Sequence, residues 1–577
     1  MGLTGALNIG RSALTASQLG LTVAGNNLAN AATPGYTRQT LELKPIRGGF
    51  LGNAFVGRGV GVEGVQRKLD EALQARLLTA RSNEASATQR LQSYAEVEST
   101  LGELTGFDFS TQLNTFFNTW SERANLIENS GVVVQQASQL SSFMRRLRSD
   151  LSDLRLQVDA QIGAAAAEAD RIAQEIASLN VQVAGLEGSG ATASALRDQR
   201  DILIGELADL IDVDVVEQPD GQVDVLVASQ PVVLAGTARA IGIRRETIDG
   251  RSTIDLVAGD DERRLDVRTG RIGGLLSGRT DAVDTAIGAL DEIAQELIHR
   301  VNDLHANGAN RDGLTSTDST LQTPVADRSL ALNDPLNPSF AGLPFTPTNG
   351  GFLLHVTRSG TGVTSTIRVD VDLDGLDATG APGFGDDTSL EDIRAAIDAA
   401  DGVTATFTPD GRLRVAADQG FEFSFAEDSS GVLAGVGLNA FFTGRDASDI
   451  DVRADLIDNP GRLTTGRIIN GALVENQTAL DLAALGDLSL DGLGGQSFRE
   501  TWQNAVNEIG LATGAAQVEA QASVVVRESL DAQRAAVSGV SIDEETINLL
   551  SYQRQFQAAA RIVSVADELL QELLAVV

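Results

Sequence analysis

Two short segments of this 577-residue chain contain residue types at spacings that could do chemistry. Residues 59–64 (GVGVEG) fit the G-x-G-x-x-G pattern, whose glycines let the backbone approach the pyrophosphate of a dinucleotide. That chemistry needs a strand before the pattern and a helix after it within a βαβ unit. No full strand is predicted before residue 59 and no such unit follows closely. We therefore predict no dinucleotide site and no bound cofactor.

The second segment, residues 370–375 (DVDLDG), fits the first half of a calcium-binding loop, in which alternate carboxylates ligate the ion. The twelfth position of such a loop is a bidentate glutamate, but here it is Ala381, and the flanking residues are strand-like. A turn with solvated acids explains the segment better, with adventitious cation binding as the alternative. The three histidines, His299, His305 and His355, have no metal-ligand spacing. We predict no metal site.

Composition excludes several classes of function. The chain has no cysteine, so disulfides and thiolate chemistry are excluded. No serine, histidine and aspartate lie around a recognisable nucleophile elbow, and 79 acidic residues are too many for one carboxylate pair to stand out. The net charge of −35 disfavours nucleic acid and anionic membranes as partners. Neither a membrane-spanning apolar run of about 18 residues nor a classical signal peptide is recognisable. We expect a non-enzymatic protein, and its export would leave the amino terminus intact.

Matching apolar repeats mark the two ends of the chain. Each repeat alternates spacings of three and four residues, which places its members on one face of a helix, as in the seam of a coiled coil. The N-terminal seam consists of Leu7, Leu14, Leu21 and Leu28, interleaved with Leu3, Gly10, Ser17 and Ala24. The C-terminal seam consists of Leu549, Phe556, Val563, Leu570 and Val577, interleaved with Tyr552, Ala559, Ala566 and Leu573. We predict that the two end helices pair through these seams.

Charge and residue size define how the ends would pair. Residues 1–40 contain two arginines and no acid, a charge of +2, whereas residues 541–577 contain six acids and two arginines, a charge of −4. Opposite charges favour joining the two ends over self-association of each. Small seam residues permit close approach but remove apolar area, and burying one leucine contributes only about 1.5–3 kcal/mol. We expect the ends to be loose in a monomer and to become ordered among neighbouring copies.

Local signals mark where the two end helices stop and start. Asn26, Asn27 and Asn30 are expected to form hydrogen bonds where the first helix ends, and Pro34-Gly35 fits the central positions of a type II turn. At the other end, Ser541 and Glu544 fit a capping box, in which each side chain bonds the other residue's backbone N–H. These residues are predicted to fix the geometry of the paired ends.

Between the ends, helical and β patterns alternate. Helices are predicted over residues 3–30, 65–104, 135–186, 195–210, 272–305, 390–400 and 498–537, with a final helix after 539. Hairpins are predicted around 219–221 and 409–411, and strands over 366–373 and 412–416. The predicted domains are 1–35 with 541–577 (terminal coiled-coil inner domain), 36–211 with 270–311 and 496–540 (helical rod-like domain), 212–269 (small β domain) and 312–495 (outer mainly β domain with a short helix).

Both ends resemble the signatures of bacterial flagellar rod, hook and hook-associated proteins. The resemblance lies in residues 12–14 (SAL), 26–30 (NNLAN), 33–39 (TPGYTRQ), 538–545 (SGVSIDEE) and 550–561 (LSYQRQFQAAAR). Internal segments look like the hook-associated protein 1 family within that superfamily, namely 61–67 (GVEGVQR), 196–203 (LRDQRDIL), 273–276 (GGLL) and 301–305 (VNDLH). Hook and rod proteins lack the long helical block that carries residues 197–201.

The resemblance implies a multidomain α+β fold. The discontinuous N- and C-terminal helices would form an antiparallel inner coiled coil, stacked with other copies around the secretion channel. A helical-bundle domain would surround it, with inserted, mainly β outer domains. The ends would self-assemble into a ring or short helical tube.

The resemblance also implies a role and a location. The protein would be a structural subunit that joins hook to filament at the distal end of the hook, outside the cell. Its partners would be the hook protein, the third hook-associated protein, and a cytoplasmic export chaperone on the C-terminal helix. It would be exported unfolded by the flagellar type III apparatus. The alternatives are a hook or distal-rod protein, or an axial scaffold that carries an adhesive or glycan-hydrolase insert at 312–495.

Overall fold

The computed structural model describes residues 3–51, 54–102, 108–125, 130–189, 192–248, 251–341, 343, 345–377 and 379–576. The chain forms two compact units: unit 1 comprises residues 1–93, 157–279 and 513–577, and unit 2 comprises 94–156 and 280–512. Three long helices continue from one unit into the other: α2 (Glu71–Leu101), α4 (Ser130–Glu187) and α13 (Phe498–Ser538). The predicted division into four domains is finer than these two units and stays a prediction.

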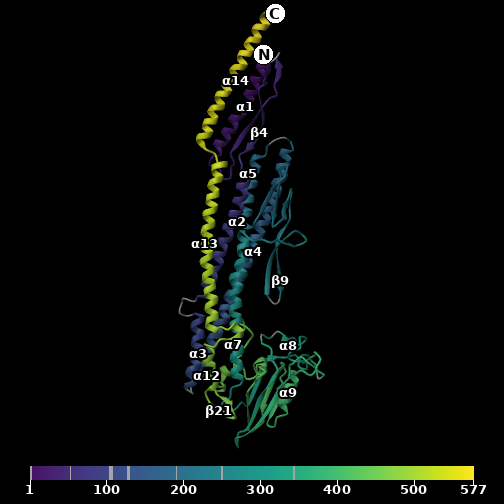
Figure 1. Ribbon diagram of the computed structural model, residues 1–577, viewed down its shortest axis with the longest axis vertical. Helices are drawn as coiled ribbons and strands as arrows, with labels where there is room; N and C mark the ends of the chain where they lie inside the picture. The colour runs from purple at the N-terminus through teal and green to yellow at the C-terminus, as the bar shows by residue number, and fades with distance from the viewer. Residues whose placement is uncertain are drawn as a thin grey trace. The chain divides into compact units, whose positions relative to one another are not determined.

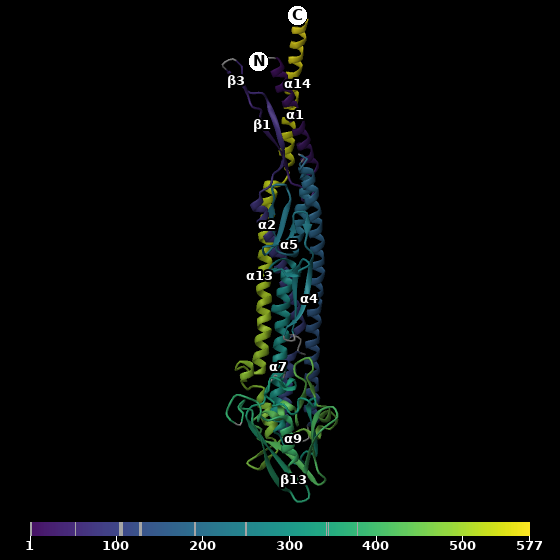
Figure 2. The ribbon, with the colours of Figure 1, turned by 90° about the vertical axis from the view of Figure 1, so that its right-hand side faces the viewer.

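Unit 1 contains both ends of the chain. Helix α1 (Leu3–Ala29) and helix α14 (Ile542–Val576) lie side by side in both views (Figures 1 and 2). The chain combines long helices with short strands, which confirms the coarse α+β class predicted from the sequence. The other helices confined to this unit are α5 (Ser194–Leu210) and α6 (Gly270–Ser277). Within the described residues, no helix is both long and apolar enough to cross a membrane.

A pair of strands follows α1. Strand β1 (Gln39–Pro45) pairs antiparallel with β4 (Val60–Arg67), with Gln39 opposite Arg67, and β2 (Gly49–Leu51) pairs with β3 (Ala54–Val56). The predicted helix start at residue 65 is therefore wrong, because residues 65–67 belong to β4. Helix α2 begins only at Glu71, where the Asp70 carboxylate accepts a hydrogen bond from Leu73 N at 3.0 Å and so caps the first turn.

A small β region of unit 1 packs on α4 and α5. Four strands form one sheet, β5 (Asp214–Glu217), β6 (Val223–Val227), β7 (Gln230–Leu234) and β8 (Thr237–Ala238), and three form another, β9 (Ile241–Ile248), β10 (Arg251–Ala258) and β11 (Arg263–Arg264). The predicted hairpin at 219–221 lies between β5 and β6. The alternate valines Val223, Val225 and Val227 are buried in one core with Ile176 of α4 and Leu207 of α5. The alternation of a half-buried strand thus produces the contact with the helices.

Unit 2 contains two three-stranded sheets around an aromatic and aliphatic core. The sheets have the orders β12-β16-β15 and β14-β13-β17. Their strands are β12 (Ser316–Gln322), β13 (Gly350–Arg358), β14 (Val363–Val371), β15 (Val403–Phe407), β16 (Arg412–Ala417) and β17 (Phe421–Ala426). Helix α9 (Leu390–Asp398) closes the core, because its buried Ile393 and Ile397 pack with Phe352 and Phe425 of the sheet.

The remaining elements of unit 2 are short apart from two helices. They are α3 (Phe109–Asn125), η1 (Gly278–Asp284), α7 (Thr285–Ala306), α8 (Pro338–Ala341), α10 (Val432–Val436), β18 (Phe442–Thr443), β19 (Asp451–Val452), α11 (Ala454–Asp458), η2 (Pro460–Arg462), β20 (Arg467–Ile469), β21 (Ala472–Val474), α12 (Gln477–Leu485) and η3 (Asp491–Leu493), of which η1 begins in unit 1. The sequence analysis did not identify α3. Its Phe116 and Trp120 are fully buried against Phe441, with ring centroids 6.3 and 5.5 Å apart.

An ionisable group on α7 makes the stability of unit 2 depend on pH. Burial, with a smaller contribution from Asp428, raises the pKa of Asp303 to about 6. In the unfolded chain an aspartate pKa is about 3.9, so the folded state binds this proton more tightly. The stability that the protonated group contributes is complete below the unfolded pKa and is lost as the pH rises through about 6.

We expect Asp303→Asn to stabilise unit 2 at pH 7.5 and to have little effect at pH 4. The difference of about two pKa units corresponds to at most about 3 kcal/mol. Calorimetric melting at the two pH values measures it, with Asp312→Asn, at an exposed position of the same unit, as the control. Equal stabilisation by Asp303→Asn at both pH values would contradict this assignment.

Candidate assembly surface at the paired termini

Small residues form the contact between α1 and α14. The buried residues of α1 are Gly10, Ala16, Ser17, Gly20, Val23, Ala24 and Asn27. On α14 the buried apolar residues are Ala559 and Ala566. A Cβ atom added to Gly10 would lie 2.8 Å from Val563 Cγ2, and one added to Gly20 would lie 2.6 Å from the ring of Tyr552. These distances are shorter than any ordinary contact, so the helices approach as closely as they do only because both positions are glycine.

The two halves of the predicted N-terminal seam differ in burial. Its interleaved residues Gly10, Ser17 and Ala24 are buried, whereas Leu3, Leu7, Leu14 and Leu21 are only half-buried and Leu28 is exposed. On α14, Leu549, Tyr552, Val563 and Leu570 are half-buried and Phe556 is exposed, while the side chain of Leu573 and residue Val577 lie outside what the structure describes. Two helices alone can cover only one side of each seam. The leucine side of the N-terminal seam therefore stays partly accessible.

Helix α14 also presents apolar side chains away from α1. Ile547 is 66% exposed, Leu550 49%, Val565 47% and Leu569 48%. A helix with apolar residues toward its partner and toward water is typical of a helix that is covered on both sides in its working state. The paired termini therefore present an exposed apolar surface.

A buried amide joins the end of α1 to the start of α14. Asn27 Nδ2 donates to Gln39 O at 2.8 Å and to Glu545 Oε2 at 3.1 Å. Asn27 Oδ1 accepts from Tyr36 Oη at 2.8 Å and from Gln39 N at 3.0 Å. Both donors and both acceptor positions of the amide are used, which fixes its orientation. Burial, followed by the charges of Asp198 and Glu545, raises the pKa of Tyr36 to about 12, so its hydroxyl stays a donor.

The other predicted exit residues lie in the same turn. Asn26 Nδ2 donates to Tyr36 Oη at 3.3 Å, and Asn30 Nδ2 donates to Asn26 O at 3.0 Å. Tyr36 N donates to Thr33 O, and Gly35 has φ = +79°, so Pro34-Gly35 occupies the centre of a type II turn. A Cβ atom at Gly35 would also lie 2.5 Å from Ile202 Cδ1 of α5, so glycine is required for space as well as for φ.

Ion pairs complete the connection between the two ends. Arg38 Nη1 lies 2.7 Å from Glu544 Oε2, and Arg38 Nη2 lies 2.7 Å from Glu545 Oε1. The predicted capping box is therefore only half formed: Ser541 Oγ accepts from Glu544 N at 3.4 Å, but the Glu544 carboxylate accepts from Arg38. A guanidinium provides a charge-assisted hydrogen bond, which is stronger than a bond from a neutral backbone N–H. The contact of Glu545 was not predicted residue by residue, although the opposite charges of the two ends indicated an attraction between them.

Helix α5 anchors the segment that leaves α1. Arg67 Nη1 of β4 lies 2.9 Å from Asp198 Oδ1 and 2.6 Å from Asp201 Oδ2, and Thr37 N donates to Asp198 Oδ2 at 3.2 Å. Burial raises the pKa of Asp201, and the charge of Arg67 opposes that shift. On the same helix, buried Arg200 Nη1 donates to Asn180 Oδ1 at 2.9 Å and to the backbone O of residue 221 at 2.8 Å. The charged segment 197–201 is thus a structural junction of unit 1.

Of the two segments first considered for chemistry, residues 59–64 pack against α1 and residues 370–375 lie in unit 2. The G-x-G-x-x-G segment continues into strand β4 and not into a helix. Carboxylate oxygens of Asp372, Asp374 and Asp387 lie within 4.8 Å of one another, a spacing that could hold a cation. Asn333 Nδ2 and the backbone N of residue 375 already donate to Asp387. Groups of the protein thus already donate hydrogen bonds to the buried Asp387 carboxylate. The closeness of three carboxylates does not by itself indicate a metal site.

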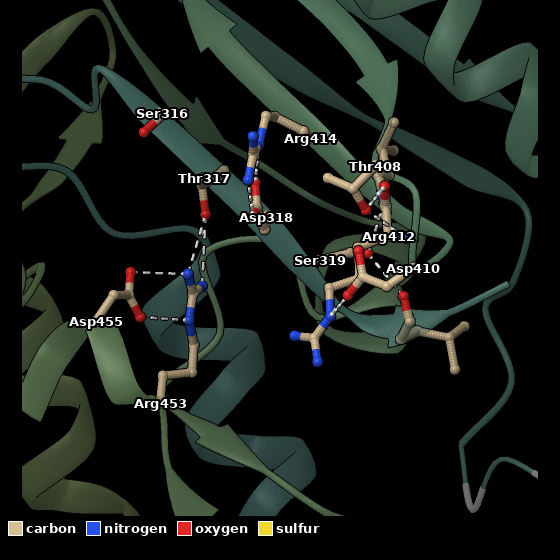
Figure 3. Close-up of polar contacts among 12 residues, drawn as sticks. Ser316, Thr317, Asp318, Ser319, Thr408, Asp410, Arg412, Arg414, Arg453 and Asp455 are labelled. Atoms are coloured by element: carbon tan, nitrogen blue, oxygen red, sulfur yellow. Dashed lines mark hydrogen bonds and ion pairs between the residues drawn. The ribbon is translucent and has the colours of Figure 1, made fainter.

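Two acids of unit 2, Asp318 of β12 and Asp455 of α11, pair with arginines. Figure 3 shows Arg453 with Asp455, at 3.0 and 2.9 Å, and Asp318 with Arg414, at 2.7 Å for both bonds. The hydrogen bonds from Arg414 lower the pKa of Asp318. A glycan hydrolase needs one carboxyl group that holds its proton near neutral pH. A carboxylate held ionised by an arginine does not meet that need.

Two of the histidines are built into unit 2. Burial lowers the pKa of His305 to about 4. Its Nδ1 donates to Asn439 O at 2.7 Å, and its Nε2 accepts from Thr464 N at 3.2 Å. Burial also lowers the pKa of His299 to about 4, and its ring stacks on Phe345 with centroids 3.8 Å apart. Both rings are neutral at pH 7 and serve as packing groups.

The hydrogen bonds at the end of α1 predict that substitution of Asn27 and of Asn26 will have different effects on amide exchange at Gln39. Asn27→Leu removes one bond to Glu545, whose carboxylate keeps its pairing with Arg38, and leaves two backbone groups of Gln39 without their side-chain partner, which costs about 1–3 kcal/mol locally. We expect the amide of Gln39 to exchange about 5- to 150-fold faster, measured by hydrogen exchange of peptides that cover 36–42. Asn26→Leu, at an exposed position, is the matched control and should change the rate little. Equal acceleration in both variants would refute the role of Asn27.

Known proteins match the chain over nearly its whole length. The family model "Flagellar hook-associated protein FlgK helical domain" matches residues 94–319. "Flagella basal body rod protein" matches 7–37, and "Flagellar basal body rod FlgEFG protein C-terminal" matches 532–576. A solved structure, the flagellar hook junction protein FlgK from Burkholderia pseudomallei, aligns with a TM-score of 0.46 at 13% identity, over 80% of this chain and 100% of that chain.

Two curated relatives have the same name. Flagellar hook-associated protein 1 of Escherichia coli is 27% identical over 98% of this chain and 99% of its own length. Flagellar hook-associated protein 1 of Bacillus subtilis is 24% identical over 98% of this chain and 97% of its own length. The matches at both ends and in the helical block between them include the paired termini described above. The chain is thus similar over nearly its whole length to flagellar hook-associated protein 1, and residues 94–319 match the helical domain of that family.

Proposed function

We propose that the protein is a structural, non-enzymatic subunit that assembles at the distal end of the flagellar hook and joins the hook to the filament. The observation that carries this proposal is the apolar surface of the paired termini that one chain leaves uncovered, in a chain similar to this family. Ile547 and Leu550 of α14 and the half-buried leucines of α1 belong to that surface. Neighbouring copies would bury it, and the products would be a ring or a short helical tube.

The rival within the same superfamily is a hook or distal-rod protein. The match of residues 94–319 to a hook-associated helical domain supports the hook-associated role instead. That stretch contains all of α3, α4 and α5, including the anchors Asp198 and Asp201. The ion pairs of unit 2 shown in Figure 3 give no support to a glycan-hydrolase insert.

The proposed partners follow from the position of the subunit and from the chemistry of α14. The hook protein would lie on one side of the assembly and the third hook-associated protein on the other. Before export, a cytoplasmic chaperone would cover the apolar residues of α14, since they would otherwise aggregate. Export would be in the unfolded state through the flagellar type III apparatus, without a cleaved signal, and the absence of cysteine suits a chain that crosses between compartments. The final location would be the extracellular hook–filament junction.

Substitution on the exposed face of α14 tests the assembly role. We expect Ile547→Glu with Val565→Glu to leave the contact with α1 intact, because both side chains are largely exposed. The added charges would oppose burial against a neighbour, so cells should produce hooks without filaments and shed flagellin into the medium. Electron microscopy of hooks and blotting of the medium for flagellin and for the variant itself measure this outcome.

The matched control adds the same charge at polar, exposed positions of α14, in Gln553→Glu with Gln557→Glu. This variant should form normal filaments. If the Ile547→Glu, Val565→Glu variant is secreted and still forms normal filaments, the surface does not serve assembly.

Amide exchange tests whether neighbours order the ends. A helix pair that packs through glycine and alanine buries little apolar area, so the pair should open readily in the monomer. We expect peptides from α14 to exchange fast in the purified protein and at least about tenfold more slowly in isolated hook–filament junctions. Strong protection of α14 in the monomer would contradict the expectation.

A further inference from the structure

A second uncovered apolar surface lies on α13. Its members alternate spacings of four and three residues, which places them on one face of the helix. We call them the α13 stripe: Ala515, Val518, Ala522, Val525, Ser529, Ala532 and Ala536, all in unit 1. Every member is exposed, Val518 by 68% and Val525 by 65%. None is charged, although the chain contains 123 charged residues (44 basic and 79 acidic).

The opposite face of α13 already has its partner. Leu530 is buried in a cluster with Leu73, Leu77 and Ala80 of α2. Ion pairs flank that contact, since Glu519 lies 3.0 Å from Arg90 and Arg527 pairs with Glu84. The α13 stripe therefore contributes nothing to the packing of unit 1. A helix that is apolar on both faces needs a second partner.

Unit 1 also contains a groove between α4 and α5. It has a volume of about 460 Å³, and its lining combines the apolar Leu179, Ile202 and Leu203 with the polar Glu175, Ser178, Gln182 and Gln199. Ile202 is 40% exposed. Nearer the N-terminus of α4, Ala160, Ala164 and Ala167 are exposed, small side chains that let another helix approach closely, and the exposed Arg171 lies between them and the groove. We call these residues together the α4–α5 groove.

The stripe and the groove lie on different sides of unit 1. In Figure 2, α13 follows one edge of the helices and α4 follows the other, with α2 and α5 between them. Contacts between two different patches, repeated from one subunit to the next, generate a ring or a helical filament. Copies that each have a charge of −35 repel one another, so an uncharged stripe is the type of surface that they can bring together.

We infer that the α13 stripe of one copy packs into the α4–α5 groove of the next copy and forms a lateral contact of the assembly. The inference rests on the proposed function, because it assumes that copies assemble side by side. It adds a specific contact between helical parts of the subunit to the contacts proposed for the paired termini. The occupant of the groove is thus a second copy of this chain.

Cysteine cross-linking tests this contact directly, because the native chain contains no cysteine. Val525→Cys or Ala532→Cys is combined in turn with Ala167→Cys or Ser178→Cys, which samples the groove along its length. Hooks with attached filaments are isolated and oxidised. Each copy contributes both a stripe cysteine and a groove cysteine, so at least one combination should give a ladder of dimers, trimers and longer multimers on a non-reducing gel.

Two controls define the geometry. Val525→Cys alone should give no dimer, since a dimer from this variant would mean that two α13 helices face each other. Val525→Cys with Leu234→Cys, a residue of β7 that is 55% exposed, should give no ladder. If none of the four combinations cross-links in hooks that carry filaments, or if Val525→Cys alone dimerises, the inference is wrong while the proposed function stands.

A charge substitution gives an answer even where the cysteine variants fail to assemble. Val525→Glu should melt at the same temperature as the native protein, because the side chain is exposed, but should leave hooks without filaments. Gln517→Glu, an exposed position of α13 outside the stripe, should form normal filaments. Normal filaments with Val525→Glu overturn the inference. Normal filaments in a strain that lacks the whole protein would instead overturn the proposed function.

Discussion

The close approach of α1 and α14 is the contact on which the other features of the ends depend. Gly10 meets Val563, and Gly20 meets the ring of Tyr552, at distances that leave no room for a Cβ atom. Glycine of α1 faces Val563 and Tyr552 in this contact, and alanine fills much of the rest, whereas other large apolar side chains of α14, such as Ile547 and Leu550, stay exposed. The same choice of residues therefore makes the pair close, weakly stabilised and apolar on its outside. These three properties suit a surface that several copies complete together.

The polar network at the base of the pair sets where the two helices meet. Asn27 uses its whole hydrogen-bonding capacity on Tyr36, Gln39 and Glu545, and Arg38 pairs with two glutamates of α14. Buried polar groups of this kind lose much free energy if a partner is displaced. They therefore define the register of the helices, which small apolar side chains define poorly. Helix α5 extends this control to β4 through Arg67.

Residue patterns predicted the parts of this architecture that depend on local chemistry. The limits of α1 and α13, the turn at Pro34-Gly35 and the helix α5 follow from periodicity and turn residues. Other features depend on distant partners and could not be predicted. Helix α3 has aromatic residues whose burial requires Phe441. The Glu544 carboxylate does not form the predicted cap, because the fold brings Arg38 close to it. Which half of the N-terminal seam is buried also depends on α14, since both halves fit the same spacing.

A cryo-electron microscopy reconstruction of the hook–filament junction tests the account most directly. The account predicts that each copy keeps the contacts of Gly10 with Val563 and of Gly20 with Tyr552 inside its own chain. It also predicts that neighbouring copies cover Ile547, Leu550 and Val565 of α14. A reconstruction in which these three side chains face open water, or in which α1 pairs with the α14 of another copy, would contradict it.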